Sequence, residues 1–156
     1  MKQGEALPTL SFTTTHNQNA SFSDYKGHWL IVYFYPKDKT PGCTLEGENF
    51  RDAAPAFEAL NAVILGVSRD TLTCHHQFKS AYHFPFELIA DTDETLCQLF
   101  DVIKTKNRYG KMVRGIERST FLIDPNGIVQ KIWRNVTVNG HVQAVLSSLE
   151  ALQNTV

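Results

Sequence analysis

The sequence has few cysteines and no excess charge of either sign. Its 156 residues include three cysteines, too few and too scattered for a disulfide scaffold, and an odd count in a reducing compartment points to reactive or buried thiols. Lys and Arg total 15 against 16 Asp and Glu, so a net charge of -1 gives no field that would gather nucleic acid or anionic lipid. We therefore expect small or specific partners, with no nucleic acid and no membrane among them.

Long hydrophobic runs are also absent. The amino terminus leads into a Pro/Thr/Ser segment with no apolar stretch long enough for a signal peptide, and no window approaches a membrane span. We therefore predict a cytoplasmic protein. No internal repeat or low-complexity linker divides the chain, and 42% hydrophobic with 20% charged residues is typical of one globular domain with its own core. The prediction is a single domain over residues 1–156.

Strand-like and helix-like stretches alternate along the chain, which favours an α/β sheet domain. Two continuous apolar runs, Trp29–Tyr35 and Ala62–Val67, are typical of strands that are covered on both faces. Between them we predict a helix from Cys43 to about Phe50, and then one or two further turns opened by Pro55. The unit so formed should be a right-handed βαβ crossover.

The second half of the chain predicts further short elements. They are a helix that begins at Asp70 or Thr71, a strand over Phe86–Ala90, a short helix capped by Asp91, and an amphipathic closing helix over Gly140–Leu152. The clearest hairpin spans Ser119–Trp133, because the Asn-Gly pair in its turn accepts the positive φ that such turns require.

Cys43 follows the first predicted strand, at the start of a predicted helix. Unpaired backbone N–H groups at a helix start favour a thiolate over a thiol, and open α/β sheets bind their ligands at the carboxyl ends of strands. An arbitrary cysteine is more often a small buried hydrophobe. Here, however, Thr40 can point its hydroxyl at the same small pocket, and two prolines and a glycine hold the loop Pro36–Gly42. This context favours a reactive thiol.

The same segment carries a resemblance to a known family. Tyr33–Asp38 followed by Thr40–Thr44 resembles the peroxiredoxins, specifically the bacterioferritin comigratory protein (peroxiredoxin Q) group, and the signature Pro-x-x-x-Thr-x-x-Cys is complete. The resemblance continues in the family's order through Gly66–Asp70, Phe84–Phe86 and Gly115–Asp124. It implies a thioredoxin-like fold with a central mixed β-sheet flanked by helices, and an enzyme that reduces hydrogen peroxide and alkyl hydroperoxides.

The resemblance also implies roles for five residues. Cys43 would be the peroxidatic cysteine, Thr40 would bind the peroxide, Arg118 would lie against the sulfur, Pro36 would shield the site, and Glu46 would orient the arginine. A cation can stabilise the negative charge that develops on the departing oxygen of the peroxide. A carboxylate one helical turn beyond the cysteine could hold the guanidinium by a bidentate pair. Each residue alone also fits a structural role as a cap, a turn, a solvated helix residue or a surface cation, so their joint spacing is what favours a site.

The sequence departs from the family at the resolving cysteine. Many relatives carry one five residues after the peroxidatic cysteine, where this chain has Glu48, and others carry one at the position of Lys79. The nearest thiol to that position is Cys74, which is displaced by about 7.5 Å along a helix. A disulfide from Cys43 to Cys74 would require the first helix to unwind after oxidation. Otherwise Cys43 would work as a one-cysteine enzyme whose sulfenic acid is reduced by an external thiol.

The remaining candidates favour structural roles. Cys97 lies among apolar residues in a short predicted helix and is most simply a packed core thiol. His75 and His76 stand beside Cys74, but adjacent helical residues point about 100° apart and cannot readily share one ion. No metal and no other cofactor is therefore expected.

Partners and alternatives follow from the same resemblance. It implies recycling by thioredoxin, glutaredoxin or a low-molecular-weight thiol, and a monomer. A thiol-disulfide oxidoreductase on the same fold is an alternative, but that chemistry usually needs a Cys-x-x-Cys pair and residue 46 is glutamate. A non-catalytic redox sensor or binding module, which would present oxidised Cys43 to a partner, is the alternative from a different class.

Overall fold

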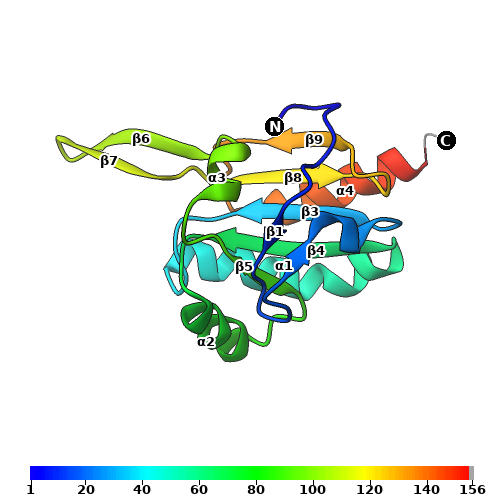
Figure 1. Cartoon of the computed structure of the whole chain (residues 1–156), viewed down its shortest axis with the longest axis horizontal. Helices are drawn as coiled ribbons and strands as arrows, with labels where there is room; N and C mark the ends of the chain where they lie inside the picture. The colour runs from blue at the N-terminus through cyan, green and yellow to red at the C-terminus, as the bar shows by residue number, and fades with distance from the viewer. Residues whose placement is uncertain (155–156) are drawn as a thin grey trace.

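A computed structural model describes residues 1–154, so the last two residues of the predicted domain 1–156 lie outside the described part. A five-stranded mixed sheet in the order β5-β4-β3-β8-β9 forms its centre (Figure 1). The strands are β3 (Trp29–Phe34), β4 (Ala62–Ser68), β5 (Glu87–Ala90), β8 (Ser119–Ile123) and β9 (Val129–Trp133). β3, β4 and β5 run parallel, whereas β8 and β9 are antiparallel to their neighbours. The predicted mixed sheet is confirmed.

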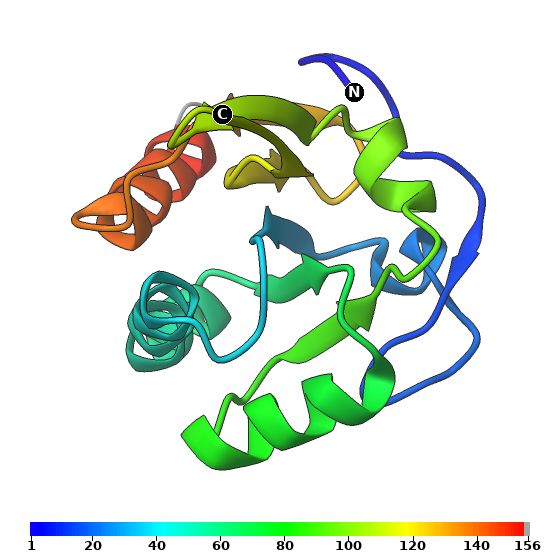
Figure 2. The same ribbon diagram turned by 90° about the vertical axis from the view of Figure 1, so that its left-hand side faces the viewer.

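Helices cover both faces of this sheet. They are α1 (Pro41–Ala59), α2 (Leu72–Tyr82), α3 (Thr95–Leu99), α4 (His141–Gln153) and the 3-10 helix η1 (Phe22–Tyr25). Side chains of α1, α2 and α4 pack into one hydrophobic core. Those of α3, η1 and the small hairpin β1 (Ser11–Phe12) and β2 (Ala20–Ser21) pack into the other. Figure 2 shows α1 and α4 on one side of the strands and α3 with the amino-terminal segment on the other.

The apolar run at the sheet centre serves both cores. Ile31 and Tyr33 point into the core formed with α1, whereas Val32 and Phe34 point into the core formed with α3. Successive strand residues face opposite sides of a sheet, so a central strand between two cores needs an apolar residue at every position. This explains the unbroken hydrophobic stretch that predicted β3.

Helix α1 differs from its prediction. It was expected to begin at Cys43 and to break before Pro55, but it runs without interruption over Pro41–Ala59. Proline is favoured at the first helical position, where its missing N–H would have no partner. Further along, the buried side chains of Phe50 and Phe57 flank Pro55 and hold the helix on the sheet, so packing compensates for the hydrogen bond that this proline cannot make.

Other predicted elements are confirmed, with adjusted bounds. The hydroxyl of Thr71 accepts from the backbone N–H of Cys74 and caps α2. The carboxylate of Asp91 accepts from two backbone N–H groups of α3, at distances of 3.0 and 2.8 Å, although the residue stands three positions before the N-cap Glu94. β8 and β9 form the predicted hairpin, and Gly127 in its turn has a φ of 82°.

A second hairpin was not predicted. β6 (Ile103–Arg108) and β7 (Lys111–Ile116) pair with each other and project from the body of the molecule (Figure 1); we call residues 103–116 the arm. Tyr109 and Gly110 form its turn, both with positive φ, as a two-residue hairpin requires. Within the described residues, no helix is long and apolar enough to cross a membrane.

Candidate active site

Cys43 occupies the third position of α1, immediately after the loop that follows β3. Its side chain is only 2% exposed. The first hydrogen bond of the helix runs from the N–H of Thr44 to the carbonyl of Thr40, so the N–H groups of Gly42 and Cys43 have no partner within the helix. No side-chain bond from Thr40 caps these donors. The partial positive charge of the helix start therefore lies close to Cys43.

Arg118, between β7 and β8, contacts that sulfur. Its Nη2 lies 3.5 Å from Cys43 Sγ, and its Nη1 donates to Glu46 Oε1 at 2.6 Å. A Cβ added at Gly42 would lie 3.3 Å from Nη2, so a larger residue there would crowd the guanidinium. The fold thus places the cation of Arg118 beside a thiol that lies 75 positions earlier in the sequence.

Glu46 is fully buried and anchors the arginine. The bidentate pair expected from the sequence is not formed, because Arg118 gives one terminal nitrogen to the carboxylate and the other to the sulfur. The second oxygen, Oε2, has no hydrogen-bond partner among the described residues. Burial raises the pKa of Glu46 to about 7, and the charge of Arg118 opposes that rise. The carboxyl group therefore titrates near neutral pH.

Thr40 and Pro36 line the same cleft as the thiol. The cleft, here called the Cys43 cleft, is bordered by the loop after β3, by Cys43 and Arg118, and by residues of the arm. The hydroxyl of Thr40 donates to the carbonyl of Lys37 at 2.8 Å, so its lone pairs remain available to accept a hydrogen bond from a ligand. Four of the five residues singled out in the sequence line this cleft, and the fifth, Glu46, contacts Arg118 behind it.

A buried network under this loop was not predicted. Asp38 is 3% exposed; its Oδ1 accepts from the hydroxyl of Tyr35 at 2.6 Å, and its Oδ2 lies in hydrogen-bond contact with Nδ1 of His75 at 2.6 Å. Nε2 of His75 lies 2.9 Å from the carbonyl oxygen of Ile89. The network ties the loop that bears Thr40 to α2 and β5.

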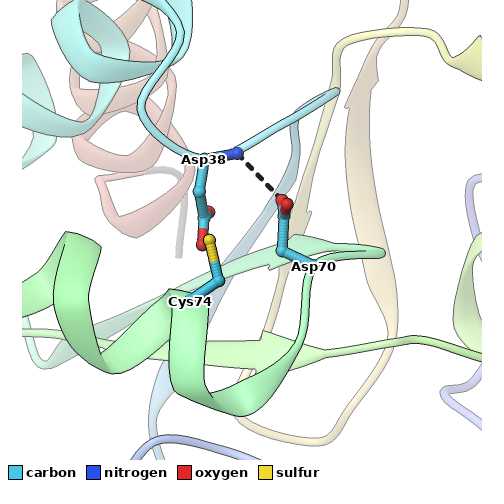
Figure 3. Close-up of side chains that lie close together, drawn as sticks. All are labelled: Asp38, Asp70 and Cys74. Atoms are coloured by element: carbon cyan, nitrogen blue, oxygen red, sulfur yellow. Dashed lines mark hydrogen bonds between the residues drawn. The ribbon is translucent and has the colours of Figure 1, made fainter.

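Asp70 and Cys74 extend this network, as Figure 3 shows. The backbone N–H of Asp38 donates to Asp70 Oδ2 at 2.8 Å, and the thiol of Cys74 lies beside the Asp38 carboxylate. Burial and the negative charge of Asp38 raise the pKa of Cys74. The ligand atoms of these three residues lie within 4.8 Å of one another, as a metal site would require. The hydrogen bonds from Tyr35 and His75 already account for both oxygens of Asp38.

The other cysteine and the histidines differ from one another in burial. Cys97 is completely buried in the core on the opposite face of the sheet from Cys43, and burial raises its pKa strongly. His75 is buried and His76 exposed, as expected for neighbours on a helix. Behind the Arg118–Glu46 pair, burial and the charge of Arg118 lower the pKa of His141 to about 4.

Tyr33 also lies beneath the site. Its hydroxyl is buried without a hydrogen-bond partner among the described residues, and burial together with the charges of Glu46 and Cys43 raises its pKa. Tyr33 and Asp38 both belong to the segment that carries the family resemblance. Their sequence positions were therefore a signal, but their buried partners could be identified only from the fold.

Comparisons with known proteins agree on one family. The model of the AhpC/TSA family matches residues 3–132. The chain is 56% identical to Peroxiredoxin Bcp of Xanthomonas campestris over 127 residues, 81% of this chain and 79% of that protein. It is 46% identical to Peroxiredoxin Bcp of Bacillus subtilis over 147 residues, 94% of each chain.

Solved structures give the same result. The fold matches a Peroxiredoxin Q structure of Xanthomonas campestris with a TM-score of 0.87 and 51% identity, covering 91% of this chain and 90% of that one. It matches a PrxQ of Xylella fastidiosa with a TM-score of 0.93 and 43% identity, covering 98% of both. The chain therefore belongs to the AhpC/TSA family, as a peroxiredoxin of the Bcp (peroxiredoxin Q) group with a thioredoxin-like fold and the thiol peroxidase activity of that family.

Proposed function

We propose that Cys43 is the residue of this thiol peroxidase that attacks the hydroperoxide. The observation that supports this most directly is the 3.5 Å contact between Arg118 Nη2 and Cys43 Sγ, at the edge of a cleft. The thiolate forms an S–O bond with one peroxide oxygen while the O–O bond breaks. The other oxygen leaves as hydroxide or alkoxide and takes up a proton, and Cys43 becomes a sulfenic acid.

The surrounding residues divide the remaining tasks. Arg118 stabilises both the thiolate and the negative charge that develops on the departing oxygen. Thr40 accepts the hydrogen bond of the peroxide proton, since its own hydrogen is engaged with Lys37. Glu46 fixes the guanidinium from the buried side, and Pro36 shields the sulfur from bulk water. These are the roles implied by the family resemblance, and the geometry of the cleft is compatible with all of them.

The substrates proposed are hydrogen peroxide and alkyl hydroperoxides. A solved structure of the bacterioferritin comigratory protein of Xanthomonas campestris, 47% identical to this chain with a TM-score of 0.87, concerns alkyl peroxide reduction by that protein. The loop, the thiol and the cation present the same chemistry to either class, because the reacting O–O bond is common to both. We further propose a cytoplasmic monomer that thioredoxin or glutaredoxin recycles.

A one-cysteine cycle is the proposed route, with Cys74 as the alternative resolving residue. Cys43 and Cys74 each lie in the first turn of a helix that follows one of two adjacent parallel strands, so both are at the same edge of the sheet. A disulfide needs Cα atoms within roughly 7 Å, which would require the first turn of α1 to unwind. We assign Cys97 no part in either route, because it lies in the core on the other face of the sheet.

Intact mass after oxidation tests this proposal. The fully reduced protein is mixed with one equivalent of hydrogen peroxide and measured within seconds, beside the Cys43→Ser, Cys74→Ser and Cys97→Ser variants. A gain of about 16 mass units that requires Cys43 means a sulfenic acid and a one-cysteine cycle. A loss of about two that Cys74→Ser abolishes means a disulfide and a two-cysteine cycle. An unchanged mass, or oxidation that persists in Cys43→Ser, would show the assignment of Cys43 to be wrong.

Turnover assays distinguish a peroxidase from the redox sensor and from the thiol-disulfide oxidoreductase. A peroxidase consumes peroxide repeatedly when thioredoxin, its reductase and NADPH are supplied, whereas a redox sensor stops after one oxidation. A thiol-disulfide oxidoreductase would reduce insulin disulfides. The position that would hold its second cysteine is Glu46, which is buried and bonded to Arg118, so we expect no insulin reduction.

A further inference from the structure

The arm over residues 103–116 forms one wall of the Cys43 cleft. It projects as an isolated two-stranded hairpin from the edge of the molecule (Figure 1), and neither strand pairs with the central sheet. A two-stranded hairpin is marginally stable in water without further packing. The peroxide chemistry proposed above uses none of its side chains. We therefore ask which other function a projecting hairpin beside a reactive thiol could serve.

Alternation along β6 places three cations on one face of the arm. Lys104, Lys106 and Arg108 are two residues apart, so they point to the same side, and all three line the Cys43 cleft. Lys37 and Arg69 line the cleft from the body of the molecule. The chain as a whole carries a net charge of -1, so this concentration of positive charge is local.

Some of these charges have no partner. Lys104 pairs with Asp101 and Lys106 with Glu117, each at 3.2 Å. Arg108 stands directly opposite Lys111 in the register of the arm, and neither forms an ion pair with any described residue. Like charges directly opposite each other destabilise a strand pair. Nothing in the described part of the chain offsets this repulsion, so an anionic partner would stabilise the arm.

Apolar side chains accompany these cations. Tyr109 at the tip is fully exposed, and Val113, which pairs with Lys106 and shares the face of the cations, is 46% exposed. Met112, on the opposite face of the arm, is 68% exposed. Leu45, two positions after Cys43 on α1, is 49% exposed. Aromatic residues, Met and Arg are enriched in protein–protein interfaces relative to the rest of the protein surface. The combination of exposed apolar residues and unpaired cations indicates a surface that a protein covers.

We propose that the arm is the docking surface for the protein that reduces oxidised Cys43, and that this partner presents an acidic face around its reactive thiols. The inference rests on the proposed function of Cys43. A strand of six residues extends about 20 Å, far more than a hydroperoxide or a small thiol can cover. Cys43 is 2% exposed and lines this cleft together with residues of the arm, so a protein reductant that reaches the sulfur through the cleft must lie against the arm.

The reaction at this surface balances with a dithiol partner. One thiol of the partner attacks the Cys43 sulfenic acid, forms a mixed disulfide and releases water. The second thiol of the partner then attacks its own sulfur in that mixed disulfide, which frees the reduced Cys43 and leaves the partner with an internal disulfide. Two electrons pass from the partner to Cys43, and no other co-reactant is needed.

Two variants test this proposal in the full-length protein. Arg108→Glu reverses an unpaired cation of the arm, and Tyr109→Ala removes its apolar tip. Lys26→Glu is the matched control, because Lys26 is also an exposed cation and lies before β3, at the opposite end of the strand from Cys43. Turnover is followed with bacterial thioredoxin, its reductase and NADPH, and with glutaredoxin and glutathione. Oxidation of Cys43 by hydrogen peroxide is measured separately by stopped flow.

We expect the KM for the protein reductant to rise at least about fivefold in Arg108→Glu and in Tyr109→Ala, and to change less than about twofold in Lys26→Glu. The rate of oxidation by peroxide should be unchanged in all three. The inference is wrong if both arm variants behave like the control, if they slow oxidation by peroxide instead, or if only small thiols reduce the wild type. Failure of the wild type to be oxidised at Cys43 would instead overturn the proposed function.

Discussion

Arg118 divides its two terminal nitrogens between a sulfur and a carboxylate. Because Nη2 lies 3.5 Å from Cys43 Sγ, we expect Arg118→Gln to lower the second-order rate constant for oxidation by hydrogen peroxide by roughly 10²-fold, the size found when one donor to a developing charge is removed. Stopped-flow fluorescence measures this constant. Lys26→Gln, which removes an exposed cation far from the thiol, should leave it unchanged. A loss below threefold in Arg118→Gln would contradict the proposed role.

The sequence predicts the reacting residues of this site better than it predicts the hydrogen bonds that support them. Cys43, Thr40 and Arg118 belong to motifs with fixed spacing or fixed order, so they could be selected before the fold was known. The bond between Asp38 and His75 joins residues 37 positions apart. It depends on β3 and β4 being adjacent and parallel, which places the loop after one strand beside the helix after the other. Local patterns carry no information about such a contact.

At the scale of elements, the bond between Asp38 and His75 joins the loop that bears Thr40 to α2. We expect Asp38→Asn to lower the free energy of unfolding by about 3 kcal/mol, because removing one member of a buried hydrogen-bonded pair leaves its partners unsatisfied. Urea unfolding measures this change. Asp52→Asn, at an exposed position of α1, is the control and should change stability by less than about 0.5 kcal/mol. A difference of less than about 1 kcal/mol between the two variants would show that the network is not a structural link.

The two elements that sequence patterns described poorly have distinct physical causes. α1 continues through Pro55 because its buried face packs on the sheet, and tertiary packing outweighs local propensity. The arm was missed because its strands are rich in lysine and arginine and bury little, so no hydrophobic alternation marks them. The five strands of the central sheet were predicted: β3, β4 and β8 are largely buried and apolar, β5 is a short apolar run, and β9 was marked by the turn of its hairpin.

At the scale of the whole molecule, two groups near Arg118 make the free energy of unfolding depend on pH in opposite directions. Burial raises the pKa of Glu46 from 4.5 to about 7, so the folded state binds more protons in that range and stability falls as pH rises. The pKa of His141 is lowered from 6.5 to about 4, so the unfolded state binds more protons there and stability falls as pH decreases. In the wild type the two effects offset each other between these limits.

Single variants should reveal how each group changes the free energy of unfolding with pH. In Glu46→Gln, the free energy of unfolding should increase from pH 4.5 to 6.5, by on the order of 1 kcal/mol, because the effect of His141 is no longer opposed by that of Glu46. In His141→Gln it should decrease over the same interval. Urea unfolding at several pH values measures both trends, with Lys26→Gln as the control that keeps the wild-type profile. Parallel profiles in the two variants would show that these groups do not titrate as their burial requires.

The sheet that separates Cys97 from the other two thiols makes this cysteine an internal reporter of folding. Cys97 is completely buried, and its thiol reaches water only when the core around α3 opens. In a Cys43→Ser/Cys74→Ser variant, alkylation of this single thiol should therefore proceed at the rate set by opening of the native state. Timed labelling in a crude lysate, read by mass, would then report how fast the native core opens at a given temperature, without purification and without any assay of activity.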